Sequence, residues 1–307
     1  MRTTPLFDTN VFSDASQGAI SPREWALLKK QRPRRGWPLS AVTAMELLAG
    51  IDAVPEAQFS NARGAIRLAY ELSAGRILPE PRALICEKIL KRTLPEVEIR
   101  PDVLSKHMLV ASRAANKCEL FEGHVFIARV SRRVDKLGGF DPELIAKLVK
   151  GPKEKWVGTL GAVLDSIAPT WRERAERGER HLPNESREQF DRPEVWAQRR
   201  AEFLETFTEW LAPGLPAEEA RKVEQRIDAV LQFAISIMKD VLLRNYAFSK
   251  RDSDIYDLFQ LHYLACEQFV FVTRDGPLMS KVRQSSQANR ILDFHQFLGG
   301  RQPASKS

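Results

Sequence analysis

The fold is indicated first by the stretch Phe269-Val270-Phe271-Val272-Thr273-Arg274-Asp275, an apolar run that ends in an aspartate. A continuous run rich in valine and phenylalanine is typical of a strand buried on both faces, as in parallel sheets. A second segment of this kind, Leu6-Phe7-Asp8-Thr9-Asn10-Val11-Phe12, also places an aspartate directly after an apolar start. We expect both segments to form strands, the second over residues 4–12.

Two further acidic residues stand in comparable places. Glu46 follows the segment Leu39-Ser40-Ala41-Val42, which reads as a short strand running into the opening turns of a helix, and Asp257 begins an apolar run. Side chains at the carboxyl ends of parallel strands lie in the crevice where open α/β sheets bind their ligands. A cluster of carboxylates there suits a hard divalent cation with oxygen ligands.

The four acids in this order resemble the pattern of the PIN-domain nucleases. That pattern has an N-terminal strand followed by Asp-(Thr/Ser)-(Asn/Ser) and a glutamate at a strand-to-helix junction. It then has an aspartate at the head of a helix and, 18 residues later, a strand that ends Val-Thr-Arg-Asp. The residues that match in order are Asp8, Glu46, Asp257 and Asp275. The resemblance covers roughly residues 1–95 and 250–300.

The resemblance implies a fold and a site. The fold is α/β, with a mainly parallel sheet flanked by helices. The site consists of Asp8, Glu46, Asp257 and Asp275, which are expected to be both the catalytic residues and the ligands of Mg²⁺ or Mn²⁺. The auxiliary candidates beside these acids are Asp254, Asn10 and Thr273.

The activity implied by the resemblance is endonucleolytic hydrolysis of single-stranded RNA that leaves 5′-phosphate and 3′-hydroxyl ends. A bound divalent cation would polarise a phosphodiester oxygen and lower the pKa of a water that attacks phosphorus. The commonest bacterial role of such nucleases is the toxin of a toxin–antitoxin pair. The expected partners are therefore RNA, a protein antitoxin or other protein, and a second copy of the chain.

Each acid also has an ordinary structural explanation. Asp8 suits a helix cap, Glu46 suits a first helical turn, and Asp275 begins an Asp-Gly-Pro turn signal. Asp254 competes with Asp257, because carboxylates three residues apart project from the same face of a helix. The spacing of the resemblance favours Asp257, and leaves Asp254 as a helix cap or an auxiliary acid.

Composition indicates a globular protein of the cytoplasm. The 307 residues are 43% apolar and 28% charged, and no uninterrupted apolar stretch approaches the length of a membrane span. The sequence enters a strand-like segment within five residues, so no signal peptide is expected. The three cysteines are far apart and in apolar contexts, which favours reduced core residues over disulfides or a zinc site.

Positive charge favours a polyanionic partner. The formal net charge is +7, and residues 61–150 hold 17 lysines and arginines against 11 aspartates and glutamates. Nucleic-acid binding draws on such surfaces through phosphate contacts. Residues 29–35 carry five positive charges in seven residues, which suits either a solvated helix end or phosphate contact. Arg132 and Arg133 form a smaller basic group that we expect to bind the phosphate backbone.

The chain divides into two kinds of sequence. Residues 1–95 and 246–307 alternate strands and helices and form the PIN-like core, whereas residues 96–245 show helices only and form an insertion that departs from the family. The helices expected there cover residues 102–117, 124–136, 141–149, 156–177 and 218–247. The tryptophans of this insertion, at positions 156, 171, 196 and 210, are expected to be core anchors rather than base-stacking platforms.

Two other functions compete with an endoribonuclease. A nuclease for DNA or for a folded nucleic acid would use the same acids, because no feature of the sequence reads the 2′-hydroxyl. A non-catalytic binding or scaffold protein could keep the sheet and bind partners through the helical insertion. His262 lies within an apolar segment and is expected to be a core residue, not a general base.

Overall fold

The computed structural model describes residues 3–93, 100–134, 192–244 and 253–300. The elements of the first half are β1 (Thr4–Phe7), α1 (Thr9–Ser16), α2 (Pro22–Gln31), α3 (Ala41–Ala53), α4 (Glu56–Ser73), α5 (Pro81–Ile85), the π-helical turn η1 (Cys86–Leu90), α6 (Pro101–Arg113) and α7 (Lys117–Val134). Those of the second half are α11 (Pro193–Leu211), α12 (Ala217–Arg226), α13 (Asp228–Arg244), α14 (Ser253–Leu261), the 3-10 turns η3 (His262–Ala265) and η4 (Ala288–Arg290), β2 (Phe269–Thr273), α15 (Gly276–Lys281), β3 (Ile291–Asp293) and α16 (Phe294–Leu298).

The described strands form one parallel sheet in the order β1-β2-β3. Strand β2 is central, and all five of its residues are buried, as its continuous apolar run predicts. Phe7 of β1 pairs with Val272 of β2, and Thr273 of β2 pairs with Asp293 of β3. The predicted α/β class is confirmed, and the carboxyl ends of adjacent strands lie side by side.

The strand predictions need three corrections. The strand expected over residues 4–12 ends at Phe7, because the Asp8 side chain accepts a hydrogen bond from the Thr9 amide and starts α1 there. The short strands expected before Glu46 and at residues 76–79 meet only in an isolated bridge between Leu39 and Ile77. Strand β3 was not predicted, because three residues are too short for a recognisable pattern.

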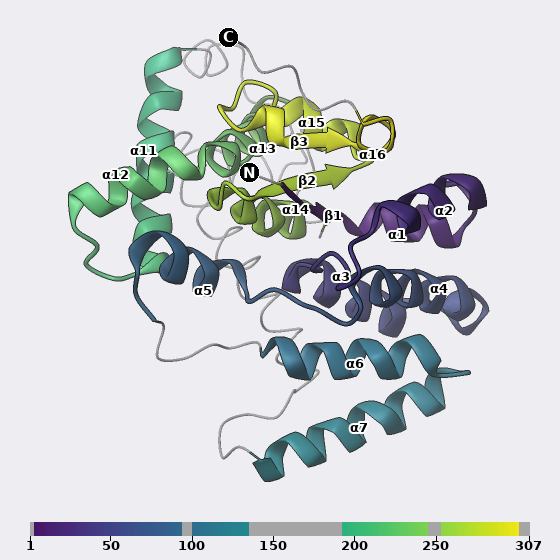
Figure 1. Ribbon diagram of the computed structural model, residues 1–307. Helices are drawn as coiled ribbons and strands as arrows, with labels where there is room; N and C mark the ends of the chain where they lie inside the picture. The colour runs from purple at the N-terminus through teal and green to yellow at the C-terminus, as the bar shows by residue number, and fades with distance from the viewer. Residues whose placement is uncertain (1–2, 94–99, 135–191, 245–252, 301–307) are drawn as a thin grey trace, which may run out of the picture.

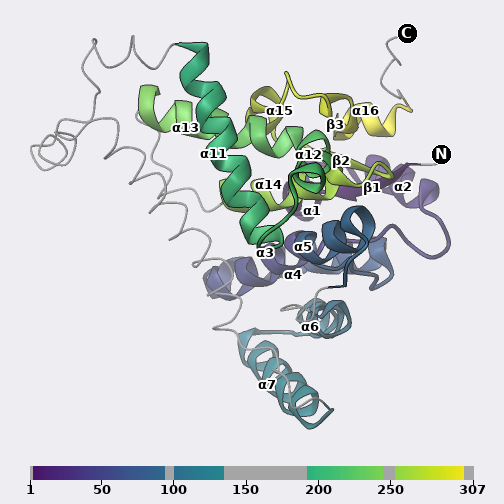
Figure 2. The same cartoon turned by 90° about the vertical axis from the view of Figure 1, so that its left-hand side faces the viewer.

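The helices on one side of the sheet are stacked in layers (Figure 1). Helix α3 packs against α14 and α4, α6 packs against α3 and α4, and α7 packs on α6 as the outermost layer. The same order is visible from the side (Figure 2). None of the helices in the described part of the chain is both long and apolar enough to cross a membrane.

Helix boundaries follow the capping signals more closely than the apolar periodicity. Ser21 forms the predicted cap of α2, with Glu24 completing a capping box. Helix α4 ends through two left-handed residues, Ala74 with φ 51° and Gly75 with φ 71°, where the sequence indicated Gly75 alone. Helix α7 begins at Lys117 and not at the predicted residue 124.

The helix predicted over residues 218–247 is broken into α12 and α13 at Ile227. The side-chain amide of Gln287 spans the break, since its Nε2 donates to the Arg226 carbonyl at 2.6 Å and its Oε1 accepts from Ala229 N at 2.9 Å. At the break, Asp228 Oδ1 accepts a hydrogen bond from Arg200 Nη2 at 2.8 Å. These tertiary contacts replace the missing helical hydrogen bonds, which is why the apolar spacing alone did not reveal the break.

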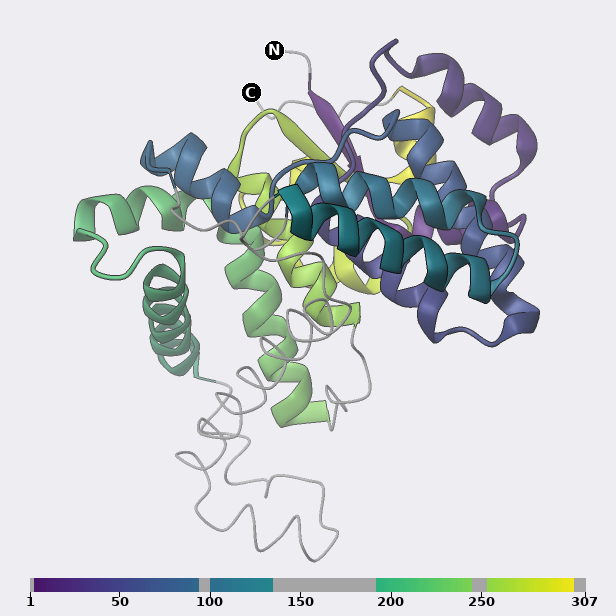
Figure 3. The same cartoon turned by 90° about the horizontal axis from the view of Figure 1, so that it is seen from below.

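The described helices of the segment 96–245 lie in two places (Figure 3). Helix α6 lies beside α4 and carries α7 on its outer side, whereas α11 and α12 lie at the other end of the molecule. One hydrophobic core includes side chains of both groups, together with those of the sheet. The domain boundaries at 96 and 245 stay a prediction, and the expected helices at 141–149 and 156–177 lie outside the described residues.

Two tryptophans of α11 behave as the predicted core anchors. Trp196 is buried, and the half-buried Trp210 packs on the core. His262 is also a core residue, stacked on Phe207 with ring centroids 4.8 Å apart. Burial lowers the pKa of His262 to about 4, so this imidazole is neutral at physiological pH.

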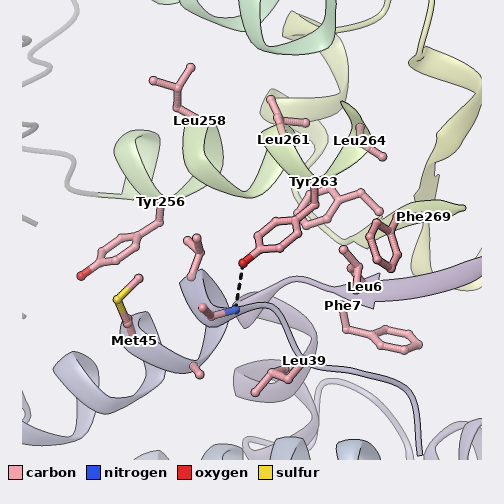
Figure 4. Close-up of a cluster of buried hydrophobic side chains, with 14 of the residues drawn as sticks. Leu6, Phe7, Leu39, Met45, Tyr256, Leu258, Leu261, Tyr263, Leu264 and Phe269 are labelled. Carbon is pink, nitrogen blue, oxygen red and sulfur yellow. Dashed lines mark hydrogen bonds between the residues drawn. The ribbon is translucent and has the colours of Figure 1, made fainter. Parts of the chain in front are cut away.

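Tyr263 joins the sheet region to the start of α3 (Figure 4). Its buried hydroxyl accepts a hydrogen bond from Ala41 N at 3.1 Å and donates one to the Pro79 carbonyl at 2.8 Å. The ring lies among apolar side chains that include Leu6 and Leu39. The helix that carries Glu46 is thereby fixed at its first residue.

We expect Tyr263→Phe to lower the free energy of unfolding by about 1–3 kcal/mol, because it leaves a buried amide and a carbonyl without their partner. The corresponding fall in melting temperature is roughly 2–4 °C for each kcal/mol in a chain of this size. Thermal unfolding followed by circular dichroism measures it. An unchanged melting temperature would contradict this account of how α3 is anchored.

Candidate functional site

Asp8 is the first residue after β1 and the N-cap of α1. Its Oδ1 accepts from the Thr9 amide at 2.7 Å, and its Oδ2 accepts from the Thr273 hydroxyl at 2.7 Å. The side chain is buried, with 4% of the residue exposed. Burial, together with the negative charge of Asp275, raises the pKa of Asp8 to about 6 despite these hydrogen bonds.

Thr273, at the end of β2, connects the carboxyl ends of β1 and β2. While its hydroxyl donates to Asp8, the same oxygen accepts from Asn10 Nδ2 at 3.1 Å and from the Asp275 amide at 2.9 Å. Asn10 Oδ1 in turn accepts from the Arg274 amide at 3.2 Å. Of the auxiliary candidates, Thr273 therefore binds the Asp8 carboxylate directly, and Asn10 is linked to it through Thr273.

Glu46 faces Asp8 from helix α3. It is the sixth residue of that helix, so the alternative of a first-turn glutamate is wrong. The Thr9 hydroxyl donates a short hydrogen bond to its Oε2. Burial of the carboxyl group, followed by the charge of Asp8, raises the pKa of Glu46 to about 8.

Gln260 is a site residue that the sequence analysis missed. Its Nε2 lies 3.3 Å from Asp8 Oδ1 and 3.4 Å from Glu46 Oε2, so one amide bridges the two carboxylates. Its Oε1 is buried and has no hydrogen-bond partner among the described residues. The signal that could have found it is its position three residues after Asp257, on the same face of α14.

Asp257 and Asp254 both lie buried on α14. Burial raises the pKa of Asp257 well above its ordinary value, and nearby negative charges raise it further. The residues that carry these charges are Asp8, Glu46, Asp275 and Asp254. The other three predicted site acids therefore lie within electrostatic reach of Asp257, and Asp254 belongs to the same group.

The two acids of α14 can be ranked by mutation. If this group serves a divalent-dependent enzyme, Asp257→Asn should reduce its activity by at least about tenfold more than Asp254→Asn, because only Asp257 has the spacing to Asp275 that the sequence analysis singled out. Initial rates at one saturating substrate concentration measure the difference. The two variants remove the same charge from the same helix face, so each serves as the control for the other. The reverse order would show that Asp254 is the site acid.

Asp275 has two roles at once. It is the N-cap of α15, and its Oδ1 accepts from the Leu278 amide at 2.8 Å, as the turn signal in the sequence suggested. Its charge also raises the pKa values of Asp8 and Asp257. The structural explanation of Asp275 is therefore correct, and it does not exclude the functional one.

The four acids together with Gln260 and Thr273, here called the acidic group, have the chemistry of a divalent-cation site. Their oxygens belong to carboxylates, an amide and a hydroxyl, which are the ligands that Mg²⁺ and Mn²⁺ prefer. A cation would also relieve the repulsion that raises these pKa values. Within the described residues, however, no three His, Cys, Asp or Glu side chains are arranged so that they could hold one ion.

The acidic oxygens are engaged in hydrogen bonds with donors such as the Thr9 amide, the Leu278 amide and the Thr273 hydroxyl. Rotation about its side-chain torsions can turn a carboxylate toward a cation without a change in its position on the fold.

Comparison with models of known protein families, with curated proteins and with solved structures finds no match for this chain. A function therefore has to be argued from the geometry of the acidic group itself.

Proposed function

We propose that this chain is a divalent-metal-dependent nuclease of the PIN type, an endoribonuclease that hydrolyses single-stranded RNA. The observation that supports it is the convergence of four acids from different elements. Asp8 and Asp275 follow β1 and β2, while Glu46 on α3 shares the Gln260 amide with Asp8. Burial, and then the charges of these three acids, raises the pKa of Asp257 on α14. Such carboxylate groups are expected where a protein handles a hard cation.

In this proposal the cation is held by Asp8, Glu46, Asp257 and Asp275. When bound, it supplies a Lewis acid for the phosphodiester and activates water for attack on phosphorus. Thr273 and Asn10 keep the Asp8 carboxylate in place, and Gln260 keeps Asp8 and Glu46 side by side. The amide oxygen of Gln260 is left as one further acceptor.

The test is cleavage of end-labelled single-stranded RNA by the purified protein. We expect products with Mg²⁺ or Mn²⁺ and none with a chelator, and the products should carry 5′-phosphate and 3′-hydroxyl ends. Parallel reactions with single-stranded DNA and with a hairpin separate the endoribonuclease from a DNA or structure-specific nuclease. No cleavage of any of these substrates with either cation would overturn the proposal.

The second candidate is a non-catalytic scaffold that keeps the sheet and binds partners through its helices. It is favoured by the absence of a prepared set of three metal ligands in the described residues. The two candidates differ in an equilibrium measurement that needs no substrate. Titration with Mn²⁺, followed by isothermal calorimetry, should show a site that Asp8→Asn removes if the protein is a nuclease, and no such site if it is a scaffold.

A further inference from the structure

A second polar site lies between helices α4 and α6. It is a pocket of about 470 Å³, a size suited to a small ligand. The residues that line it are Arg63, Arg67, Tyr70, Glu71, Leu109, Ser112 and Arg113. Three arginines, an aromatic ring and a hydroxyl thus surround one space, with a single carboxylate among them.

The carboxylate of Glu71 does not balance the positive charge of this pocket. Its Oε2 pairs with Lys29 Nζ at 2.8 Å, and its Oε1 pairs with Arg67 Nε at 3.0 Å. Burial raises the pKa of Glu71, but these two cations outweigh it and hold the pKa below its ordinary value. Lys29 thereby adds a fourth cation at the rim. The pocket therefore retains a clear positive excess around one ionised acid.

The other two arginines are available to a ligand. Arg63 is held in place by one hydrogen bond, from Nη1 to the Ala114 carbonyl at 3.1 Å, and its remaining donors are left for other partners. Arg113 is exposed and forms no hydrogen bond or ion pair with the residues that the structure describes. A guanidinium that is fixed by one donor and free at the others is suited to phosphate, which it can bind in a forked geometry.

The basic segment at residues 29–35 reaches the same place. Lys29 binds the Glu71 carboxylate, and Arg32 donates a short hydrogen bond to the Glu71 carbonyl. Gly36, which follows, lies against the end of α4 so closely that a Cβ there would be 2.5 Å from the Ser73 carbonyl carbon. The segment that the sequence singled out for phosphate contact thus lies at the edge of the pocket.

We propose that this pocket binds the phosphate of a nucleotide, with Arg63, Arg67 and Arg113 around the phosphate and Tyr70 beside the base. Arginine is the residue of choice for phosphate recognition, and an aromatic side chain stacks on any base. The nucleotide is either a unit of a single strand or a free monophosphate. The proposal does not depend on the proposed nuclease activity, since binding here needs neither a metal nor cleavage.

The test compares two double variants of equal charge change in the full chain. Arg67→Gln with Arg113→Gln removes two guanidinium groups from the pocket. Arg221→Gln with Lys222→Gln removes two exposed cations from α12, at the other end of the molecule. The probes are a fluorescent oligouridylate, uridine monophosphate and inorganic phosphate, each titrated with a chelator present so that no cleavage occurs. Circular dichroism confirms that both variants keep the fold.

We expect the pocket variant to bind the oligouridylate at least about tenfold more weakly, because it can no longer form two charge-assisted hydrogen bonds. The slope of log affinity against log salt should fall by roughly 0.7 for each phosphate that the variant no longer binds, while the α12 variant keeps the affinity of the wild type. A pocket that also binds uridine monophosphate is a site for free nucleotide, whereas binding of the strand alone assigns it to the polymer.

Three outcomes would overturn the proposal. One is unchanged binding of both nucleotide probes in the pocket variant. Another is equal weakening in both double variants, which would mean that only the overall charge matters. The third is measurable binding of inorganic phosphate with the same affinity as uridine monophosphate, which would leave no role for the base.

Discussion

Asp8→Asn and Asp275→Asn should each reduce divalent-dependent hydrolysis by roughly a thousandfold, the effect of losing several kcal/mol of transition-state stabilisation at a metal site. Both carboxylates follow adjacent parallel strands and belong to the group that raises the pKa of Asp257. Asparagine keeps the shape of the side chain and can still accept a capping hydrogen bond, so the fold should remain. Single-turnover cleavage of labelled RNA measures the loss.

The matched control is Asp293→Asn. Asp293 is the last residue of β3 in the same sheet and caps α16, with Oδ1 accepting from His295 N at 2.8 Å. It has the same local role as Asp8 and Asp275, yet its charge is not among those that raise the pKa of Asp8 or Asp257. We expect this variant to cleave as the wild type does. Equal losses in all three variants would mean that capping, not metal binding, explains the effect.

The stability of the metal-free protein should fall as the pH rises from about 4 to about 8. Asp8 and Glu46 have pKa values of about 6 and about 8 in the folded protein, above the ordinary values of 3.8 and 4.5. At low pH both groups are protonated in the folded and unfolded states, so no stability is lost. As the pH rises, the unfolded chain releases these protons first, and the folded state is left with the cost of burying charge.

The free energy of unfolding is expected to decrease by several kcal/mol, given about 1.36 kcal/mol for each unit of pKa. Each kcal/mol lowers the melting temperature by roughly 2–4 °C in a chain of this size. Saturating Mg²⁺ or Mn²⁺ should reduce this decline, because a cation stabilises the ionised carboxylates. Differential scanning calorimetry across the pH range, with and without the cation, measures both effects.

The Glu46→Gln variant isolates the contribution of Glu46 to the pH dependence of stability from the contributions of the other titratable groups. The variant should be more stable than the wild type at about pH 9 and have a flatter pH dependence, because the neutral amide removes a buried carboxylate from beside Asp8. The difference between the two proteins should disappear below about pH 4, where Glu46 is protonated in both states. Parallel pH profiles of the two proteins would show that folding does not raise the pKa of Glu46.

The sequence predicted those parts of the fold that depend on local chemistry. The run Phe269 to Thr273 was identified as a buried strand because both of its faces need apolar residues, and Ser21 was identified as a cap because its partner Glu24 is three residues away. The break at Ile227 could not be predicted in this way. It depends on Gln287, which is distant in sequence and reaches the break only in the folded protein.

The same distinction between local signals and contacts distant in sequence applies to the site residues. Asp8 and Asp275 could be selected because each follows an apolar run closely, so that one short stretch of sequence contains both the strand and the carboxylate. Gln260 was not selected, since its position three residues after Asp257 indicates a shared helix face but not a role, which comes from two carboxylates on other elements. The pocket between α4 and α6 was missed for a related reason, because Arg63, Arg67 and Arg113 come together only when the two helices pack.

The pairing of β1 with β2 has a consequence for synthesis on the ribosome. Thr273 and Asp8 are hydrogen-bonded but 265 residues apart along the chain. In the sheet order β1-β2-β3, strand β1 has β2 as its neighbour, so it can pair only after residues 269–273 have emerged from the ribosome. A polypeptide that ends before residue 257 carries Asp8 and Glu46 without Asp257 and Asp275. The acidic group is therefore completed only after residue 275 has been added, and any activity that it supports cannot begin earlier.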